Sequence, residues 1–347
     1  MSKPKIVVAG LGDSGLLTAI HLARSADVVG IGTTPGMVSG QELGLRLARP
    51  DFWAKHHRVP YERYRRLDGV RTVHGAVTTV DTVGRTLSYK DADGVTGTEP
   101  YDVLVIATGV TNGFWRRPDV QTEAEVDAAV ASAHQTLSRA DSIAIIGGGA
   151  ASVGSAANLA DAWPDKQIDL YFPGEAALPQ HHRGVWKRVS KLLTDRRVGL
   201  HPGHRAVIPA GFELDQITHE PVEWSTGQPP TSADAVVWAV GRVRPNSDWL
   251  PSELLDDDGF VRVEATLQLP SHPEIFAIGD VAATDPLRTS ARNRADKLLA
   301  RNIRAHLKGS TLGTYKPPRR RWGSVVGTQD NGLTVFAPNG KGYRIPS

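Results

Sequence analysis

The chain has 347 residues, of which 40% are hydrophobic and 22% are charged, as in a globular protein large enough for two domains. It contains no cysteine, so disulfides, thiolate zinc sites, cysteine-ligated iron–sulfur clusters and thiol redox chemistry are excluded. A net charge of +3 is too small to indicate a nucleic-acid partner. We expect neither a spanning helix nor a secretory signal, because no apolar run approaches 18 residues and the start MSKPKIVVAG enters a strand at once. We therefore expect a cytoplasmic protein with at most peripheral membrane contact.

The first predicted element is a buried strand that turns directly into a helix. Residues 6–9 are apolar, Gly10, Gly12 and Gly15 follow with G-x-G-x-x-G spacing, and apolar residues at helical spacing come next. Gly10 permits the tight turn, Gly12 lets the backbone approach a pyrophosphate, and Gly15 lets the helix pack close to the strand. The stretch predicts a dinucleotide site with the helix N-terminus facing the phosphates.

A second strand is predicted over residues 27–32, and it ends on Gly32. An acidic residue at this point would hold the adenosine ribose, so the ribose signal is weakened here. Thr33 and Thr34 follow and supply hydroxyl groups instead.

Three further segments follow before the chain repeats its pattern. Residues 39–57 predict helical and irregular pieces over the cofactor, and residues 70–90 predict a small antiparallel excursion from the main sheet. Residues 101–109 form another buried strand that ends in Ala-Thr-Gly, and a helix is predicted over 123–137.

The pattern then occurs a second time. Residues 142–154 again read as strand, glycine turn and helix, with Ser152 at the position of the third glycine. A second strand is predicted over 168–172 and a helix over 184–194, and the strand over 233–241 again ends in glycine. This internal duplication predicts two similar α/β units.

The last third of the chain adds one strand, one helix and a short tail. The strand lies in residues 275–282, and the helix runs from about Thr289 to Leu307. From residue 311 onward, short strand-like runs around Asn331-Gly332 predict a small hairpin-bearing cap.

Five motifs in this order, VVAGLGDSG, VLVIATG, AIIGGGAASVG, VVWAVGRVRPN and IFAIGDVAA, give the chain its resemblance to a known family. It resembles the two-dinucleotide-binding-domain flavoproteins of the pyridine nucleotide-disulfide oxidoreductase superfamily. The resemblance implies an α/β fold with two Rossmann-like domains. Residues 1–112 and 242–310 would form the FAD domain, residues 113–241 the NAD(P)H domain, and residues 311–347 a small C-terminal cap.

The missing cysteines narrow the resemblance. They exclude the disulfide reductases. The run from Leu45 to Pro50, followed by Phe52-Trp53-Ala54-Lys55, resembles the segment that passes the flavin in type II NADH:quinone oxidoreductases and the apoptosis-inducing-factor-like group, which includes the ferroptosis suppressor protein. The short cap also resembles theirs. Two positions depart from that group, since many members carry an acid where Gly32 stands and a glutamate where Gly154 stands. The implied function is transfer of hydride from NADPH or NADH to FAD and then of electrons to a quinone-like or other small acceptor. A reductase of a carrier protein such as ferredoxin or rubredoxin, and a non-enzymatic NAD(P)H-sensing flavoprotein, are the alternatives.

The resemblance also implies site residues. Lys55 and Arg46 are the catalytic candidates, because positive charge favours the anionic reduced flavin; the alternative is that both are surface cations. Asp280 would hydrogen-bond the ribityl or phosphate part of FAD. The residues expected to bind the cofactors are Gly10, Gly12, Asp13, Ser14, Gly15, Thr33, Arg46, Lys55, Val77, Ala107, Thr108, Gly109, Gly147, Gly149, Ala150, Ala151, Ser152, Arg183, Arg188, Val240, Gly241, Gly279, Asp280 and Thr289.

The histidines do not predict a metal site. His56-His57 and His181-His182 are adjacent pairs, and no H-E-x-x-H run places two rings one helical turn apart. We expect no bound metal.

Two expectations concern specificity and the tail. Phe172-Pro173-Gly174 carries no acid to repel a 2′-phosphate, so NADPH should reduce the flavin at least as well as NADH, with Arg183 or Arg188 as the phosphate contact. Alternatively, these arginines form a solvated helix face and Glu175 sets the specificity. The tail, through Trp322 and Tyr315, is expected to contribute to the acceptor side of the flavin and to pairing in a homodimer; ordinary packing is the alternative.

Overall fold

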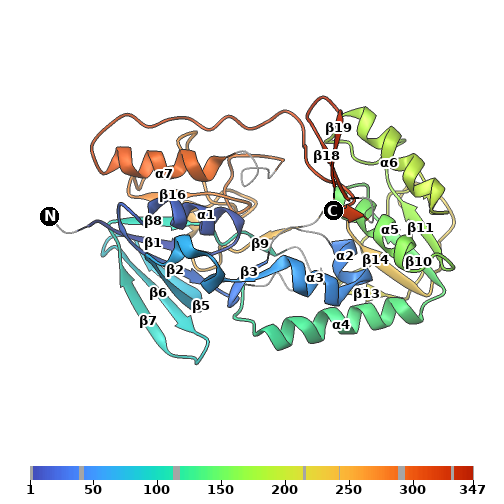
Figure 1. Cartoon of the computed structure of the whole chain (residues 1–347), viewed down its shortest axis with the longest axis horizontal. Coiled ribbons are helices and arrows are strands. Elements are labelled where there is room, and N and C mark those ends of the chain that lie inside the picture. Colours follow the sequence, from blue (N-terminus) through green and yellow to red (C-terminus); the bar gives the residue numbers. More distant parts are fainter. Residues whose placement is uncertain are drawn as a thin grey trace.

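The computed structural model describes residues 3–38, 43–111, 118–213, 216–241, 243–287, 294–329 and 332–346. Two α/β units lie side by side, and the C-terminal segment runs from one unit to the other (Figure 1). The fold is therefore the duplicated α/β architecture predicted from the repeated motifs.

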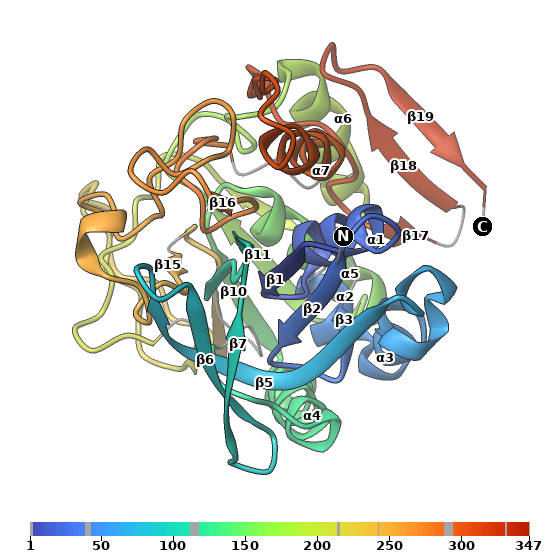
Figure 2. The ribbon, with the colours of Figure 1, turned by 90° about the vertical axis from the view of Figure 1, so that its left-hand side faces the viewer.

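The first unit is built on a seven-stranded sheet in the order β16-β8-β1-β2-β5-β6-β7. Its central strands are parallel and buried on both faces, which explains their unbroken apolar runs. The antiparallel excursion predicted over 70–90 is present and extends the same sheet (Figure 2). The strands are β1 (Lys5–Ala9), β2 (Asp27–Gly32), β5 (Val70–Asp81), β6 (Thr86–Asp91), β7 (Thr96–Pro100), β8 (Val103–Ile106) and β16 (Ile275–Ala277).

Two helices, α1 (Asp13–Leu22) and α7 (Ala295–His306), pack against each other on one face of this sheet (Figure 2). Asp296 at the start of α7 is buried, and it accepts a hydrogen bond from His21 at 2.9 Å. The predicted start of the last helix, Thr289, lies outside the described residues.

The second unit repeats the plan with a five-stranded sheet in the order β12-β11-β10-β14-β13. The strands β10, β11, β12 and β14 are parallel, and β13 is an antiparallel edge. Its elements are α4 (Glu123–Arg139), β10 (Ser142–Ile146), α5 (Ala150–Ala162), β11 (Gln167–Tyr171), α6 (Arg183–Asp195), β12 (Gly199–His201), β13 (Ile217–Thr218) and β14 (Ala235–Trp238).

The helices α2 (Leu43–Ala48) and α3 (Pro50–His57) belong to the second unit by packing, although they lie between strands of the first. Leu47 and Trp53 are fully buried, in one cluster with Leu137 of α4 and Val153 of α5. α2 approaches α5 closely because residue 44 is glycine: a Cβ there would lie 2.5 Å from the carbonyl oxygen of Gly154. The segment predicted to cover the cofactor is therefore mainly a helical brace on the second unit.

Short strands and turns complete the connections. The strand β9 (Val110–Thr111) pairs with β15 (Arg244–Pro245) where the chain passes between the units. The remaining short elements are β3 (Gly36–Val38), β4 (Arg58–Pro60), and the 3₁₀ turns Tyr61–Arg63, Arg65–Leu67 and Ser252–Leu254.

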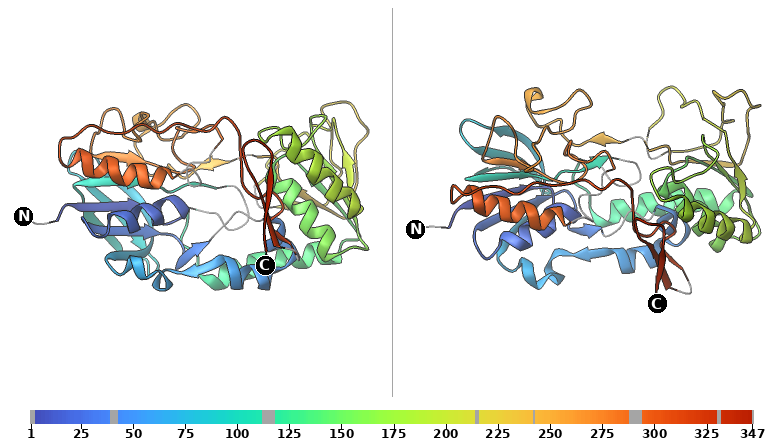
Figure 3. Two further views of the ribbon diagram at one scale, coloured as in Figure 1. Left: turned by 45° about the horizontal axis from the view of Figure 1, so that its top comes forward. Right: turned by 90° about the horizontal axis from the view of Figure 1, so that it is seen from above.

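The tail touches both units in turn. Tyr315 is buried in the core of the first unit, and the chain then crosses to the second (Figure 3). There β17 (Thr328–Gln329), β18 (Gly332–Phe336) and β19 (Gly342–Ile345) form a small antiparallel sheet, and Phe336 joins the core of the second unit. The predicted hairpin is present, although Asn331 lies outside the described residues. No helix in the described part of the chain is long and apolar enough to cross a membrane.

Candidate dinucleotide cleft

A cleft of about 1170 Å³ lies between the units and is lined by both glycine turns. The first turn contributes residues 10–14 and the second contributes residues 147–151. Segments that lie far apart in the sequence complete the lining, including residues 107–110, 238–241, 279–280 and 321–327.

The first cradle is the turn between β1 and α1. Gly10 has a φ of +101°, and a Cβ at this residue would collide with the carbonyl oxygen of Ala107. A Cβ at Gly12 would meet no protein atom within 4 Å, so this position is open toward the cleft. Gly12 is also the N-cap of α1, and no side chain caps that helix. Its first N–H groups are therefore available to an anion.

The second cradle repeats these features between β10 and α5. Gly147 has a φ of +138°, and a Cβ there would collide with the carbonyl oxygen of Ala239. Gly149 has open space at its Cβ position and is the N-cap of α5, again without a side-chain cap. By contrast, α4 begins at Thr122 with a complete capping box.

These observations fit two pyrophosphates. Each cradle has a residue whose missing side chain leaves room at an uncapped helix N-terminus, and both open into one cleft. The residues present therefore match two dinucleotide cofactors, as FAD and NAD(P)H require.

The strand ends beside the first cradle bring further predicted residues to the cleft. Gly109 (φ +68°) and Gly279 (φ +85°) take left-handed conformations, and a Cβ at Gly279 would lie 3.2 Å from Oγ of Ser14. Asp280 therefore follows a turn that packs on the first turn of α1, and it lines the cleft. Asp13 lines the cleft too. The pKa of Tyr64 is raised, mainly by burial and in addition by the negative charge of Asp13.

Tyr61 occupies the space beside Gly32 at the end of β2, and no motif in the sequence predicts this contact. Its hydroxyl donates to the carbonyl of Leu11 at 3.2 Å, and a Cβ at Gly32 would lie 3.0 Å from that hydroxyl. Burial raises the pKa of Tyr61 strongly, so the phenol is neutral. Tyr61, Thr33 and Thr34 all line the cleft. Hydroxyl groups therefore stand where an acid was expected.

Most predicted binding residues lie on the cleft. Those that line it are Gly10, Gly12, Asp13, Ser14, Thr33, Val77, Ala107, Thr108, Gly109, Gly147, Gly149, Ala150, Ala151, Val240, Gly241, Gly279 and Asp280. Gly15 and Ser152 are buried beneath the cradles, and Thr289 lies outside the described residues.

The structure does not bring the four predicted cations to the cleft lining. Arg46 is buried in α2, with its guanidinium 5.1 Å from the ring centre of Trp53, and Lys55 is exposed on α3. Arg183 and Arg188 are exposed on α6, and a Cβ at Gly342 would lie 2.8 Å from a guanidinium nitrogen of Arg188. Arg188 therefore rests against the tail sheet.

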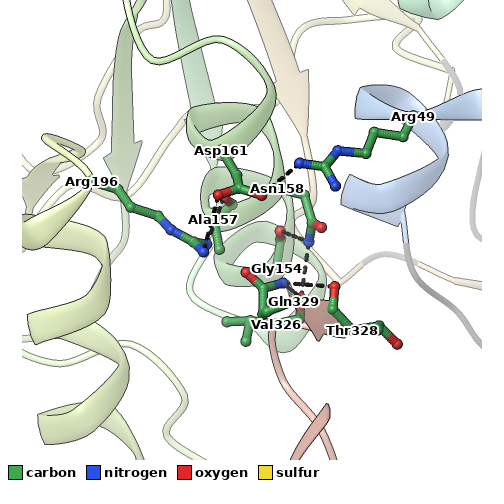
Figure 4. A network of polar contacts seen from close by, with 9 residues as sticks. All are labelled: Arg49, Gly154, Ala157, Asn158, Asp161, Arg196, Val326, Thr328 and Gln329. Carbon is green, nitrogen blue, oxygen red and sulfur yellow. Dashed lines mark hydrogen bonds and ion pairs between the residues drawn. The ribbon is translucent and has the colours of Figure 1, made fainter. Parts of the chain in front are cut away.

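The tail supplies lining residues and is anchored to α5. Asn158, which is 8% exposed, donates to the carbonyls of Gly154 at 2.8 Å and Val326 at 3.0 Å (Figure 4). Gln329 also donates to the Val326 carbonyl, at 2.8 Å. A Cβ at Gly154 would lie 2.8 Å from the carbonyl oxygen of Val325, so the tail occupies the space beside this glycine.

Of the two tail aromatics, Trp322 lines the cleft and Tyr315 does not. The Tyr315 hydroxyl donates to buried Asp285 at 3.2 Å. Asn158 and Arg205 also line the cleft and were not predicted, because contacts distant in sequence bring them there. His204, whose run His201-Pro202-Gly203-His204 was interpreted as solvated or phosphate-contacting rather than metal-binding, lines the cleft too. Among the described residues, no group of three or more His, Asp or Glu side chains could hold a metal ion.

Curated relatives share part of this chain. "Oxidoreductase ptaL" of Pestalotiopsis fici is 28% identical over 258 residues, which are 72% of this chain and 66% of that protein. "Ferroptosis suppressor protein 1" of Xenopus tropicalis is 25% identical over 62% of this chain and 59% of its own length. The chain thus spans slightly less than two thirds of the length of these relatives.

Solved structures and a family model agree with the architecture. A pyridine nucleotide-disulfide family oxidoreductase of Enterococcus faecalis superposes with a TM-score of 0.69, at 20% identity over 96% of this chain and 74% of that one. The NADH-bound, water-forming NADH oxidase of Lactobacillus brevis gives 0.63, at 20% identity over 90% and 71%. The model described as "Pyridine nucleotide-disulphide oxidoreductase" matches residues 4–301. The resemblance drawn from the five motifs is confirmed: the chain belongs to the pyridine nucleotide-disulphide oxidoreductase family.

Proposed function

We propose that the protein is an FAD-dependent NAD(P)H oxidoreductase that delivers electrons to a quinone-like or other small acceptor without a redox disulfide. The observation that carries the proposal is that two uncapped helix N-termini, each behind a glycine with an open Cβ position, face a single cleft. When bound, the cofactors supply hydride transfer from nicotinamide to flavin.

In this proposal the chain's own residues bind and orient. The backbone N–H groups at residues 12–14 and 149–151 hold pyrophosphate oxygens, and the helix dipoles favour their negative charge. Asp280 accepts a hydrogen bond from a hydroxyl of the FAD ribityl chain. Leu11, Leu43 and Val77 give the cleft apolar walls that limit water near the reacting rings.

The acceptor side is proposed to lie at the tail. Trp322, Val325 and Val326 line the cleft where the tail is held on α5 by Asn158 (Figure 4). A planar acceptor such as a quinone suits an indole with aliphatic neighbours, because flat rings stack on aromatic faces. The space that many family members fill with a glutamate side chain is taken here by the Val325 carbonyl.

The test is direct. The purified protein should be yellow, and its visible absorbance should bleach in anaerobic stopped-flow mixing with NADPH or NADH. Re-oxidation is then followed with a soluble quinone, a ferredoxin, a rubredoxin and oxygen. Rapid re-oxidation by the quinone alone supports the proposal, whereas preference for a carrier protein would replace the acceptor class. A flavin that no acceptor re-oxidises quickly would favour a sensor. Trp322→Ala should slow re-oxidation and leave bleaching unchanged, with Tyr315→Phe as the control.

A further inference from the structure

The loop after β12 is fastened to the loop after β11. The N–H of His204 donates to the carbonyl of Phe172 at 3.0 Å, and the N–H of Gly203 donates to that of Gly174 at 3.1 Å. Tyr171 and His201 end these two strands in register. Residues 204 and 205 therefore lie at the carboxyl end of the second strand of this unit, where the adenosine ribose of a dinucleotide is bound.

Arg205 is presented to the cleft from a fixed backbone. Its N–H donates to Oγ1 of Thr226 at 3.1 Å, and its carbonyl accepts from the N–H and the hydroxyl of Ser225 at 2.8 and 3.0 Å. The side chain is exposed, lines the cleft and forms no ion pair within the described residues. A guanidinium in this setting is ready for bidentate binding of a phosphate.

His204 stands beside it on an aromatic support. Its ring lies edge-on to Tyr171 and Trp224, with ring centres 5.3 and 4.9 Å apart. Nδ1 of His204 donates to the carbonyl of Pro202 at 2.9 Å, so Nε2 donates to a phosphate oxygen when the ring carries both protons. Because the ring also lines the cleft, it adds a second nitrogen group next to Arg205.

Nothing on the cleft lining at this point opposes an anion. Asp169 is engaged by His201 at 2.7 Å and by Gln167 at 2.8 Å. Glu175 is exposed and is absent from the lining. Within the described part of the chain, Arg205 thus forms no ion pair, and the only acids that line the cleft, Asp13 and Asp280, lie beside the first cradle.

We infer, on the basis of the proposed function, that Arg205 together with His204 binds the 2′-phosphate of NADPH and sets a preference for NADPH over NADH. This assignment replaces Arg183 and Arg188, which lie on α6 outside the lining. Arg205 follows β12, the third strand of this unit, whereas a contact to the 2′-phosphate was expected from residues that follow β11, the second strand.

The test measures binding to the purified holoenzyme by calorimetry, with adenosine 2′,5′-bisphosphate and 5′-AMP as probes. Wild type should bind the bisphosphate more tightly. Arg205→Ala should weaken it about 30-fold, equivalent to ~2 kcal/mol, and change 5′-AMP affinity little. Arg205→Lys should keep part of the preference, since it retains the charge without the planar fork.

Arg183→Ala and Arg188→Ala serve as matched controls and should bind both probes as wild type does. The inference is overturned if Arg205→Ala binds the bisphosphate normally, if it loses both probes equally, or if a control shows the selective loss. If wild type carries no flavin or neither nucleotide bleaches it, the proposed function fails, while the probe titrations still decide the role of Arg205.

Discussion

The two dinucleotide-binding units build the same cradle with different helix packing. In the first unit, a Cβ at Gly15 would collide with the carbonyl oxygen of Gly10 and lie 3.0 Å from the Cβ of Ala107. In the second unit, Ser152 occupies the matching position, fully buried, and its hydroxyl donates to the carbonyl of Gly149 at 2.9 Å. The first two glycines of the pattern thus shape the turn in both units. The residue at the third position, Gly15 or Ser152, differs because the helix lies closer to the strand in the first unit.

The largest effect should come from adding a side chain at Gly15, where the first unit has no room for one. Gly15→Ala forces a methyl group into the backbone of the turn, and we expect a loss of at least ~3 kcal/mol of unfolding free energy together with most of the flavin. Ser152→Ala removes one hydrogen bond and should cost ~1 kcal/mol with flavin retained. Thermal unfolding and the flavin-to-protein absorbance ratio measure both. Equal losses in the two variants would contradict the comparison.

A second prediction concerns Asp280, which lines the cleft and follows β16, the parallel edge strand of the first sheet. The corresponding edge strand of the second sheet, β13, is antiparallel. Asp280→Ala should lower flavin occupancy severalfold, because it removes the carboxylate that we propose accepts a hydrogen bond from a cofactor hydroxyl. Binding of 5′-AMP at the second cradle should be unaffected. Full yellow colour in the purified variant would remove Asp280 from the flavin site.

A third prediction separates the tail from both cradles. Asn158→Ala leaves the Gly154 carbonyl without its side-chain donor and weakens the anchor on Val326, at a cost of ~2 kcal/mol. Re-oxidation of the flavin by a quinone should slow, while bleaching by NADPH stays as in wild type. The control is Gln329→Ala, which removes the second donor to the Val326 carbonyl and a bond to the Thr328 carbonyl but leaves Asn158 in place. Slowed bleaching with normal re-oxidation would place the tail on the nicotinamide side.

The smallest effect concerns helix starts. Thr122→Ala breaks the capping box of α4 and should cost ~1 kcal/mol, the same with or without added NADP⁺. The uncapped start of α5 should instead be stabilised by the ligand, by ~2.7 kcal/mol at 100 times the dissociation constant. Thermal shifts of wild type and Thr122→Ala across a nucleotide titration test this. A smaller ligand shift in the variant would link α4 to the site.

The parts of the fold that sequence could predict are those set by neighbouring residues. Apolar runs give the buried strands, and glycines at fixed spacing give the turns, so both cradles were located before the structure. The helix over 123–137 was found with an end within two residues of α4. These elements depend on local periodicity and backbone freedom alone.

Contacts between distant segments account for what was missed. The segment 39–57 was placed over the cofactor, and Leu43 and Gly44 do line the cleft. Its helices also pack elsewhere, since Leu47 and Trp53 find their apolar partners in α4 and α5. Tyr61 fills the space above Gly32, and a hydrogen bond from His204 to Phe172 brings Arg205 to the ribose end. Arg183 and Arg188 were chosen because they are near in sequence, and the structure places both on α6 outside the cleft lining. No pattern along the chain records such pairings.

The brace formed by α2 and α3 has a consequence for the order of folding during synthesis. The core of the second unit contains Leu47 and Trp53, made well before its own strands, and Phe336, made long after them. When the strands of this unit emerge from the ribosome, α2 and α3 have therefore already been made, whereas the tail with Phe336 has not. Until the tail is made, the side chains of this core that pack with Val325, Val326 and Phe336 lack those partners, and exposed apolar surface favours aggregation. The core of the second unit is therefore completed only when the tail has been made.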